Sequence, residues 1–281
     1  MEKTLYISDL DGTLMRSDQS LSEFTVQTLN DLIERGMLIS YATARSFQSA
    51  SAVTRQIRFA VPVITRNGCV FADQREKKEI KILRFSEDEK RTLRRLLDGV
   101  IDTIGFVTAY FDGGMRKVYL DGPLCPGFRS YVDDYAGDPR MHPIHDPDRL
   151  FDGMVTYVTL IAEKEALQPV FERVKDAGPW ECVFQKDTYS PYFWLEICPP
   201  GATKANAVSA LKKQLGCDKL VVFGDTKNDL SMFSAADLKC AVENADEEVK
   251  AAADVILPSN DEDGVARFLL EEFRKNQRHL E

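Results

Sequence analysis

Paired cysteines and long apolar runs are both missing from this 281-residue sequence. Its cysteines stand singly and form no Cys-x-x-Cys pair, which argues against a structural zinc site and against a disulfide framework. No stretch approaches the roughly 18 apolar residues that a membrane-spanning helix needs, and the first residues lack the apolar segment of a secretory signal. The sequence therefore predicts reduced thiols in a cytoplasmic protein with no membrane partner. The six cysteines are Cys69, Cys125, Cys182, Cys198, Cys217 and Cys240.

Basic residues are in the minority. The chain has 36 Lys and Arg residues against 45 Asp and Glu residues, which gives a formal net charge of −9. A surface of that sign repels nucleic-acid backbones and no basic stripe stands out, so we expect no nucleic-acid partner. A small anionic substrate is still compatible with this net charge if cations or backbone N–H groups at one site provide local positive charge. No heptad or long apolar stripe indicates an oligomeric state.

Strand and helix patterns alternate at both ends of the chain but not in the middle. Alternation indicates βαβ units and a parallel sheet, whereas the irregular order between residues 83 and 192 is typical of an α+β module. We therefore expect an α/β fold: a Rossmann-like core of residues 1–82 and 193–281 with an inserted α+β domain at 83–192. Expected core strands are 5–7, 37–42, 61–65, 219–223, 239–242 and 254–257, and expected core helices are 22–35, 46–57, 203–215, 229–236, 247–252 and 263–275. In the insert we expect helices at 86–100, 128–135 and 163–177, a hairpin at 106–119, and strands at 154–161, 182–185 and 192–197.

Two aspartates end the first predicted strand, in the run Asp9-Leu10-Asp11-Gly12-Thr13. The end of a strand in a parallel sheet lies in the crevice where such proteins bind ligands. Two close carboxylates need a compensating cation, and Mg²⁺ prefers such hard oxygen ligands. A carboxylate held beside a metal and a phosphate can attack phosphorus. A simple surface turn after a strand would use the same residue types.

A second acidic cluster follows another apolar strand, in Gly224-Asp225-Thr226-Lys227-Asn228-Asp229. Asp225, Asn228 and Asp229 offer hard oxygen atoms that suit Mg²⁺. A turn with an Asn or Asp helix cap is the alternative interpretation of this cluster alone. Two acidic clusters at strand ends in one chain favour a shared metal site.

Two smaller signals lie between the acidic clusters. Thr43-Ala44-Arg45 follows the second predicted strand, where a hydroxyl and backbone N–H groups near a helix start are suited to phosphate. Lys204 lies in the first turn of a predicted helix, where its charge opposes the helix dipole. Taken alone, Thr43 is equally consistent with a helix cap and Lys204 with a solvated surface residue.

These four motifs, in this order, resemble those of the haloacid dehalogenase-like phosphatases, in particular the Cof-type branch with a large cap between the second and third motifs. That family's pattern is Asp-x-Asp-x-Thr, a Thr or Ser after the second strand, a Lys, and Gly-Asp-x-x-Asn-Asp. An additional Asn-Gly pair is matched by Asn67-Gly68, and a late Asn-Ala by Asn244-Ala245. Two positions depart from the pattern: Ala44 replaces the usual Gly, and Glu243 replaces a common Gly before Asn244.

The resemblance implies a Mg²⁺-dependent phosphatase that hydrolyses a small phosphorylated metabolite, such as a sugar, cofactor or nucleotide phosphate, through an aspartyl phosphate. It implies that Asp9 is the nucleophile and Asp11 the general acid and base. The same resemblance implies Mg²⁺ held by Asp9, Asp11, Asp225 and Asp229. Residues implied to bind the substrate are Thr43, Ala44, Arg45, Asn67, Lys204 and Asn228.

The insert resembles a cap that selects the substrate. Weaker candidates within it are Asp112, Arg116, Arg129, His142, His145 and Tyr189; a zinc site at the two histidines is disfavoured because no further ligands lie nearby. Two alternatives to the phosphatase stay open: a sugar phosphomutase of the same fold, and a binding protein that has lost its chemistry. The sequence does not identify the natural substrate.

Overall fold

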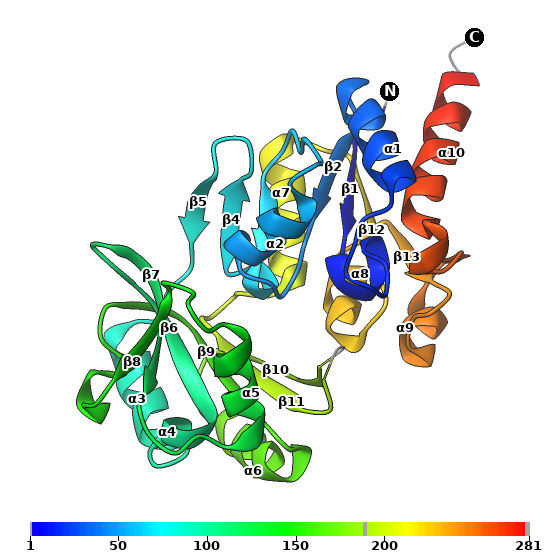
Figure 1. Ribbon diagram of the computed structural model, residues 1–281. Coiled ribbons are helices and arrows are strands. Elements are labelled where there is room, and N and C mark those ends of the chain that lie inside the picture. The colour runs from blue at the N-terminus through cyan, green and yellow to red at the C-terminus, as the bar shows by residue number, and fades with distance from the viewer. Residues whose placement is uncertain (1, 188–189, 279–281) are drawn as a thin grey trace. The chain divides into compact units, whose positions relative to one another are not determined.

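The structure is a computed structural model that describes residues 2–187 and 190–278, and the chain divides into two compact units (Figure 1). One unit, here called the core unit, consists of Met1–Lys81 and Thr203–Glu281. The other, the inserted unit, is Ile82–Ala202. The core unit is therefore assembled from two stretches of sequence that the inserted unit separates.

A parallel five-stranded sheet forms the centre of the core unit. Its strand order is β14-β13-β12-β1-β2, and every neighbouring pair is parallel. The three central strands are short apolar runs whose side chains are mostly buried, as expected where helices cover a parallel sheet on both faces, whereas Ile256 of the edge strand β14 is exposed. Their bounds are β1 Thr4–Ser8, β2 Leu38–Tyr41, β12 Lys219–Gly224, β13 Leu238–Val242 and β14 Val255–Leu257.

An antiparallel sheet of three strands continues beside β2. These strands are β3 Val63–Thr65, β4 Val70–Asp73 and β5 Lys78–Ile82. A parallel bridge between Ala42 and Ile64 joins the end of β2 to β3.

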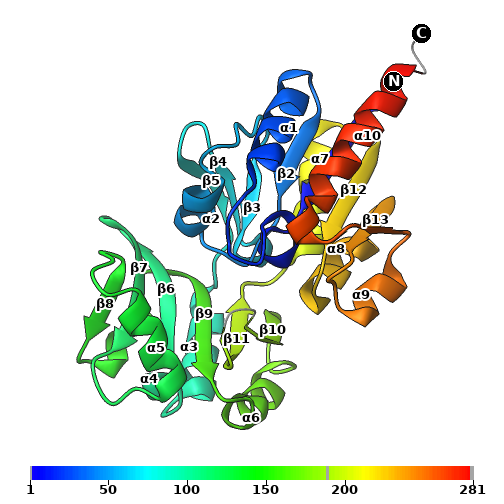
Figure 2. The ribbon, with the colours of Figure 1, turned by 45° about the vertical axis from the view of Figure 1, so that its right-hand side comes forward.

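Helices pack against the core sheet and against each other. The helix α1 contacts α10, and α7 contacts α8; both views show α1 and α10 side by side (Figures 1 and 2). Side-chain caps begin several of them: Ser22 accepts the Thr25 N–H at α1, and Thr203 accepts the Asn206 N–H at α7. The core-unit helices are α1 Glu23–Glu34, α2 Phe47–Thr54, α7 Lys204–Leu215, α8 Leu230–Ser234, α9 Glu247–Ala252 and α10 Gly264–Arg278.

The order of the strands determines where polar side chains gather. Strand β1 lies between β2 and β12, and all three run in the same direction. Their carboxyl ends therefore meet at one edge, where the chain continues into Asp9 after β1, Thr43 shortly after β2 and Asp225 after β12. Three segments far apart in sequence are brought together by this topology.

The inserted unit contains a six-stranded sheet in the order β10-β11-β9-β6-β7-β8. All its pairings are antiparallel except β7 with β8. Its strands are β6 Gly105–Phe111, β7 Gly114–Leu120, β8 Met141–Ile144, β9 Met154–Ala162, β10 Glu181–Lys186 and β11 Phe193–Cys198. Its helices are α3 Glu87–Leu97, α4 Ile101–Ile104, α5 Pro126–Asp134 and α6 Lys164–Val174.

The predicted α/β fold, with a parallel core and an additional α+β unit, is confirmed. A capping box joins Ser86 to Glu89 at the start of α3, within the helix expected at 86–100. The expected boundary at residue 192 needs correction, because β11 pairs with β9 and β10 and the inserted unit extends to Ala202. The sequence did not predict β4, β5 or β8; β5 is charged and β8 contains Pro143, so neither shows a clear strand pattern.

None of the helices in the described ranges combines the length and apolar character needed to cross a membrane.

Candidate active site

A buried lysine joins two of the strand-end carboxylates. Asp9 follows β1, and its backbone N–H donates to the Phe223 carbonyl at 2.9 Å. The Lys204 Nζ donates to Oδ1 of Asp9 at 2.8 Å and to Oδ1 of Asp229 at 2.7 Å. Lys204 is 2% exposed, Asp9 5% and Asp229 0%, so these charges interact away from water. The first residue of α7 therefore connects the two acidic motifs.

The second acidic motif is held by backbone N–H groups and one hydroxyl. The Oδ2 of Asp229 accepts the N–H of Asp225 at 3.0 Å and that of Thr226 at 3.2 Å. The Thr13 hydroxyl donates to Oδ1 of Asp225 at 2.7 Å. Both oxygens of Asp229 are thus engaged, by Lys204 on one side and by backbone on the other. This arrangement orients Asp229 and leaves Oδ2 of Asp225 facing the Gly12 turn.

Asp9, Asp225 and Asp229 together offer a site for a metal ion. One carboxylate oxygen from each lies within 4.8 Å of the others, and all three residues are buried. Three carboxylates with a single ammonium carry a net charge of −2 when ionised, which a divalent cation with a preference for oxygen ligands would balance. The donor set therefore fits Mg²⁺.

Burial has a marked effect on the protonation of this cluster. Burial raises the pKa of Asp9 to about 7, although Lys204 opposes the shift. Burial, together with the charge of Asp229, raises the pKa of Asp225 well above its usual value. Burial disfavours the Lys204 ammonium, but Asp229 and Asp9 outweigh it and raise the lysine pKa. Shifted pKa values in a buried cluster of ionisable groups are typical of a functional site.

The turn after Asp9 requires glycine at position 12. Gly12 has φ +74°, which disfavours other residues, and a Cβ there would lie 2.2 Å from Oδ2 of Asp225. The Gly12 carbonyl accepts the side-chain amide of Asn244 at 2.7 Å. Close approach of this turn to the second acidic motif thus depends on the missing side chain.

Asp11 lies outside the three-carboxylate group and is held by Arg45. The Arg45 Nε donates to Oδ2 of Asp11 at 2.7 Å, and Nη2 donates to Oδ1. Nη2 also donates to the Gln19 side chain at 3.0 Å. The side chains of Asp11 and Arg45 are 20% and 16% exposed, so the pair is largely shielded from solvent. This bidentate pairing fixes the plane of the Asp11 carboxylate.

The loops after β2 and β3 are joined by backbone hydrogen bonds. The N–H of Asn67 donates to the Thr43 carbonyl at 3.0 Å, and the N–H of Arg66 donates to the Arg45 carbonyl at 3.0 Å. Asn67 has φ +51° and is 2% exposed. Ala44 is not among the residues with positive φ, so alanine replaces glycine there without backbone strain.

Gly68 allows the β3 loop to approach α7. A Cβ at Gly68 would lie 2.3 Å from the Thr203 carbonyl, directly before Lys204. Gly68 therefore has a structural role, which is to let the loop pack against the residue that caps α7. Asn228 is partly exposed, and its Oδ1 accepts the Thr226 hydroxyl at 2.9 Å.

Two residues were not assigned a role from sequence. Thr13 orients Asp225 through its hydroxyl, as described above. Asn260 is 3% exposed; its N–H donates to Oδ1 of Asn244 at 3.0 Å and its amide donates to the Met15 carbonyl at 2.9 Å. The amides of Asn244 and Asn260 thus hold both sides of the Gly12 turn. Asn244 belongs to the Asn-Ala pair singled out above, whereas Asn260 carries no sequence signal of its own.

The weaker candidates of the inserted unit are dispersed. Arg116 on β7 and His142 on β8 meet, with Nη1 and Nε2 3.3 Å apart, and burial lowers the pKa of His142. The exposed His145 lies 3.9 Å from Asp121, so the two histidines have different partners. Asp112 lies in the β6–β7 turn and Arg129 is exposed on α5, whereas Tyr189 lies outside the described residues.

Comparison with known proteins identifies one family across nearly the whole chain. The family described as haloacid dehalogenase-like hydrolase matches residues 6–269. One relative is the 5-amino-6-(5-phospho-D-ribitylamino)uracil phosphatase YitU of Bacillus subtilis, 27% identical over 94% of this chain and 96% of the relative. Another is the HMP-PP phosphatase of Cronobacter sakazakii, 29% identical over 81% of this chain and 79% of the relative.

Solved structures have the same fold. A haloacid dehalogenase-like hydrolase from Bacteroides thetaiotaomicron has a TM-score of 0.75 and 26% identity, and the match covers 96% of this chain and 99% of that one. TM0651 from Thermotoga maritima has a TM-score of 0.73 and 25% identity, with 96% and 97% covered. The similarity spans both the core unit and the inserted unit.

Proposed function

Since this chain belongs to the haloacid dehalogenase-like hydrolases, we propose that it is a Mg²⁺-dependent phosphatase that acts on a small phosphorylated metabolite through an aspartyl phosphate on Asp9. The resemblance recognised in the sequence and the hydrolase class are confirmed by the family match and by relatives named as phosphatases. The observation that carries the finer proposal is the Lys204 ammonium between Asp9 and Asp229 in a buried carboxylate cluster.

Asp9 is the proposed nucleophile because one of its oxygens is held and the cluster lies at the ligand-binding edge of the sheet. Lys204 engages Oδ1, which leaves Oδ2 to attack phosphorus. The bond between phosphorus and the ester oxygen breaks as the bond to Asp9 forms. Asp11 donates a proton to the leaving oxygen, so the alcohol departs neutral.

The second half of the reaction returns Asp9 to its starting state. Asp11, now ionised, accepts a proton from water as that water attacks the aspartyl phosphate. The acyl phosphate bond breaks and inorganic phosphate leaves. Arg45 orients the ionised Asp11 for the second step, and at least one of its two hydrogen bonds must be released before Asp11 can carry the proton that the first step requires.

Mg²⁺ fits beside these groups. The carboxylates of Asp9 and Asp225 and the backbone carbonyl of Asp11 would hold it, and Asp229 would orient its waters. When bound, the ion supplies positive charge that offsets the phosphoryl oxygens. Lys204, Asn228 and the loop Thr43-Ala44-Arg45 with Asn67 are the proposed phosphoryl contacts, since hydroxyl, amide, ammonium and N–H donors stabilise charge spread over phosphoryl oxygens.

The inserted unit is the proposed substrate-selecting cap, and we propose a cytoplasmic location. The family match spans this unit as well as the core unit. The relatives' names suggest phosphate esters of small metabolites as substrates, and this chain's own substrate is to be found by assay.

The test is release of inorganic phosphate from a panel of phosphate esters, with Mg²⁺ and with excess chelator. The panel includes sugar phosphates, flavin mononucleotide, pyridoxal phosphate, nucleotides and the phosphoribitylaminouracil named for YitU. Mg²⁺-dependent release that favours one ester supports the proposal and identifies the substrate class. Transfer of the phosphoryl group between two positions of one sugar, with little release of inorganic phosphate, would indicate a mutase instead of a phosphatase. Absence of turnover by folded protein would favour a binding protein.

A further inference from the structure

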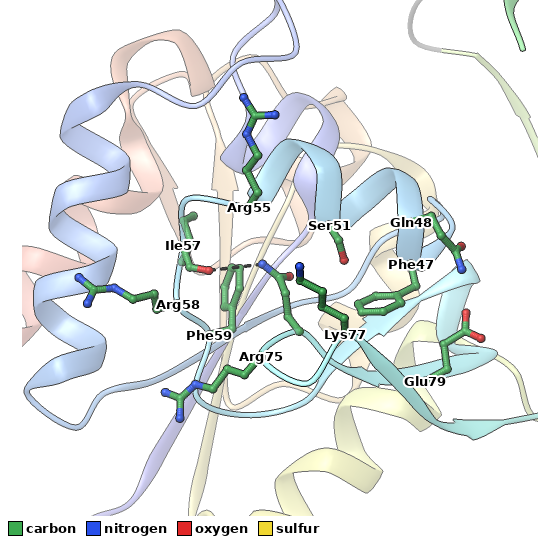
Figure 3. A pocket seen from close by; sticks show the side chains of 11 residues that line it. Phe47, Gln48, Ser51, Arg55, Ile57, Arg58, Phe59, Arg75, Lys77 and Glu79 are labelled. Carbon is green, nitrogen blue, oxygen red and sulfur yellow. Dashed lines mark hydrogen bonds between the residues drawn. The ribbon is translucent and has the colours of Figure 1, made fainter. Parts of the chain in front are cut away.

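A second cavity lies in the core unit, between α2, the segment that follows it, and the turn that joins β4 to β5 (Figure 3). Its volume is about 560 Å³, within the range of sites that bind small ligands. None of the residues that line it belongs to the candidate active site, although α2 begins only two residues after Arg45. The proposed phosphatase function gives this cavity no role.

The floor of the cavity is apolar and fixed. Phe47, Ile57 and Phe59 line it and are 5%, 2% and 2% exposed. The side-chain amide of Gln74 donates to the Thr54 carbonyl at 3.1 Å and to the Ile57 carbonyl at 3.3 Å, the latter drawn in Figure 3. These hydrogen bonds fix the backbone before Phe59, so the floor presents a small apolar surface that is already formed.

The walls of the cavity are basic. Arg55, Arg58, Arg75 and Lys77 line it with a single acid, Glu79. The formal charge of this set is +3, in a chain whose net charge is −9. Arg58 forms an exposed ion pair with a glutamate of α1, whereas no ion pair joins Arg55, Arg75 or Lys77 to a carboxylate in the part of the chain that the structure describes. Apart from Arg58, the basic residues of the cavity therefore carry charge that no carboxylate of the described residues pairs with.

The basic side chains are arranged around the aromatic floor. In Figure 3 the Lys77 side chain lies between the rings of Phe59 and Phe47, whereas the guanidinium groups of Arg55 and Arg75 extend away from these rings toward opposite edges of the view. The β4–β5 turn that presents Lys77 is held by Asp73, whose Oδ1 accepts the N–H of Arg75 at 2.9 Å. Lys77 is thus the cation that lies among the apolar residues, and the two arginines add positive charge around the cavity.

We propose that this cavity binds a small organic anion with a flat ring system. The ring would lie against the floor formed by Phe47, Ile57 and Phe59, and a phosphate, sulfonate or carboxylate group would face Lys77, with Arg55 and Arg75 turning toward it. Guanidinium groups match such oxyanions in a bidentate manner and also stack on rings. The two requirements, ring and negative charge, follow from the floor and the walls respectively.

Fluorescence titration of the full-length protein with anilinonaphthalene sulfonate tests the proposal, because this probe is a flat ring anion without a phosphate ester. We expect saturable binding that excess inorganic phosphate with Mg²⁺ does not displace. Lys77→Gln and Arg55→Gln should each weaken binding about fivefold to tenfold, since each removes one charged contact. The uncharged N-phenylnaphthylamine should bind at least about tenfold more weakly than the sulfonate.

The matched control is Lys78→Gln, which removes the same charge from the neighbouring residue that does not line the cavity. Binding to this variant should equal that of the unmodified chain. An equal loss of affinity for the probe in Lys77→Gln and Lys78→Gln would mean that only the net charge of the protein matters, and it would overturn the proposal. Displacement of the probe by phosphate with Mg²⁺ would show that the probe binds at the carboxylate cluster, and this result would also overturn the proposal.

Discussion

The ammonium of Lys204 lies 2.8 Å from the Asp9 carboxylate, although 195 positions separate the two residues in sequence. The same ammonium reaches Asp229, so one cation partly neutralises three buried carboxylates. Removing it would leave those charges without a buried partner, a situation far costlier than the loss of a surface ion pair. The stability of the core unit therefore depends on the same side chain for which we propose a role in the reaction.

Lys204→Met should lower the free energy of unfolding by about 3–5 kcal/mol in the presence of chelator and should abolish phosphate release. Urea denaturation at neutral pH measures the first effect. Lys212→Met is the control, because Lys212 is on the same helix and forms a partly exposed pair with Asp237 at 2.6 Å. That variant should lose less than about 1 kcal/mol. Similar losses in both variants would contradict the interpretation.

The proposed division of roles between Asp9 and Asp11 predicts different trapped states. With 4-nitrophenyl phosphate the leaving group needs no acid, so Asp11→Asn should still phosphorylate Asp9 but hydrolyse the intermediate about 10²-fold to 10⁴-fold more slowly. Mass spectrometry of acid-quenched protein should then show one added phosphoryl group, together with a burst of nitrophenolate. Asp9→Asn should show neither the adduct nor the burst. A phosphorylated Asp9→Asn protein would exclude Asp9 as the nucleophile.

Gly12→Ala should lower both the stability and the phosphatase activity, and comparison with a control glycine separates the effect of backbone strain from the effect on the site. The new Cβ would meet Asp225 in a backbone conformation of φ +74°. Gly36→Ala is the control, because Gly36 also has positive φ, +93°, but has no atom within 4 Å of the added Cβ. Both variants should lose about 1–2 kcal/mol of stability from φ alone. Only Gly12→Ala should also lose at least about 10²-fold in phosphatase activity, an effect of about 2.7 kcal/mol on the barrier.

Sequence patterns predicted the residues that follow buried strands. Asp9, Thr43 and Asp225 could be identified because an apolar strand followed by polar residues marks the binding edge of a parallel sheet. Lys204 was identified because a lysine in a first helical turn opposes the dipole, and the structure shows the carboxylates that compensate it. The local sequence pattern was sufficient to identify site residues wherever the sheet topology brings the ends of the strands together.

Contacts between surface segments were not predictable in this way. The pairing of Arg45 with Asp11 depends on the path of two loops, and nothing in either motif specifies it. The strand β5 is charged and has only two apolar residues, too short an alternation to identify a strand, and the turn before it is held by Asp73. The basic cavity combines Arg55 and Lys77 from separate elements, so its charge becomes apparent only in three dimensions.

The ion pair between Asp138 and Arg140 in the inserted unit predicts a pH-dependent contribution to stability. The Arg140 Nε lies 2.9 Å from Oδ1 of Asp138, and the two side chains are 19% and 15% exposed, respectively. This hydrogen bonding lowers the pKa of Asp138 from 3.8 to about 2. The unfolded chain therefore takes up the proton more readily than the folded protein. The stabilisation is complete above pH 3.8 and is lost as the pH falls toward 2.

Asp138→Asn should accordingly lower the free energy of unfolding by about 2 kcal/mol at pH 7, since each pKa unit corresponds to about 1.4 kcal/mol. The difference between the variant and the unmodified chain should shrink steadily as the pH is lowered from about 4. Urea denaturation followed by tryptophan fluorescence at several pH values measures it, because Trp180 and Trp194 both lie in the inserted unit. Asp134→Asn, at an exposed carboxylate of the same segment, should show no such trend. A difference that stays constant from pH 7 to pH 3 would contradict a stabilisation by the charge of Asp138, because asparagine keeps an oxygen that can accept the Arg140 N–H.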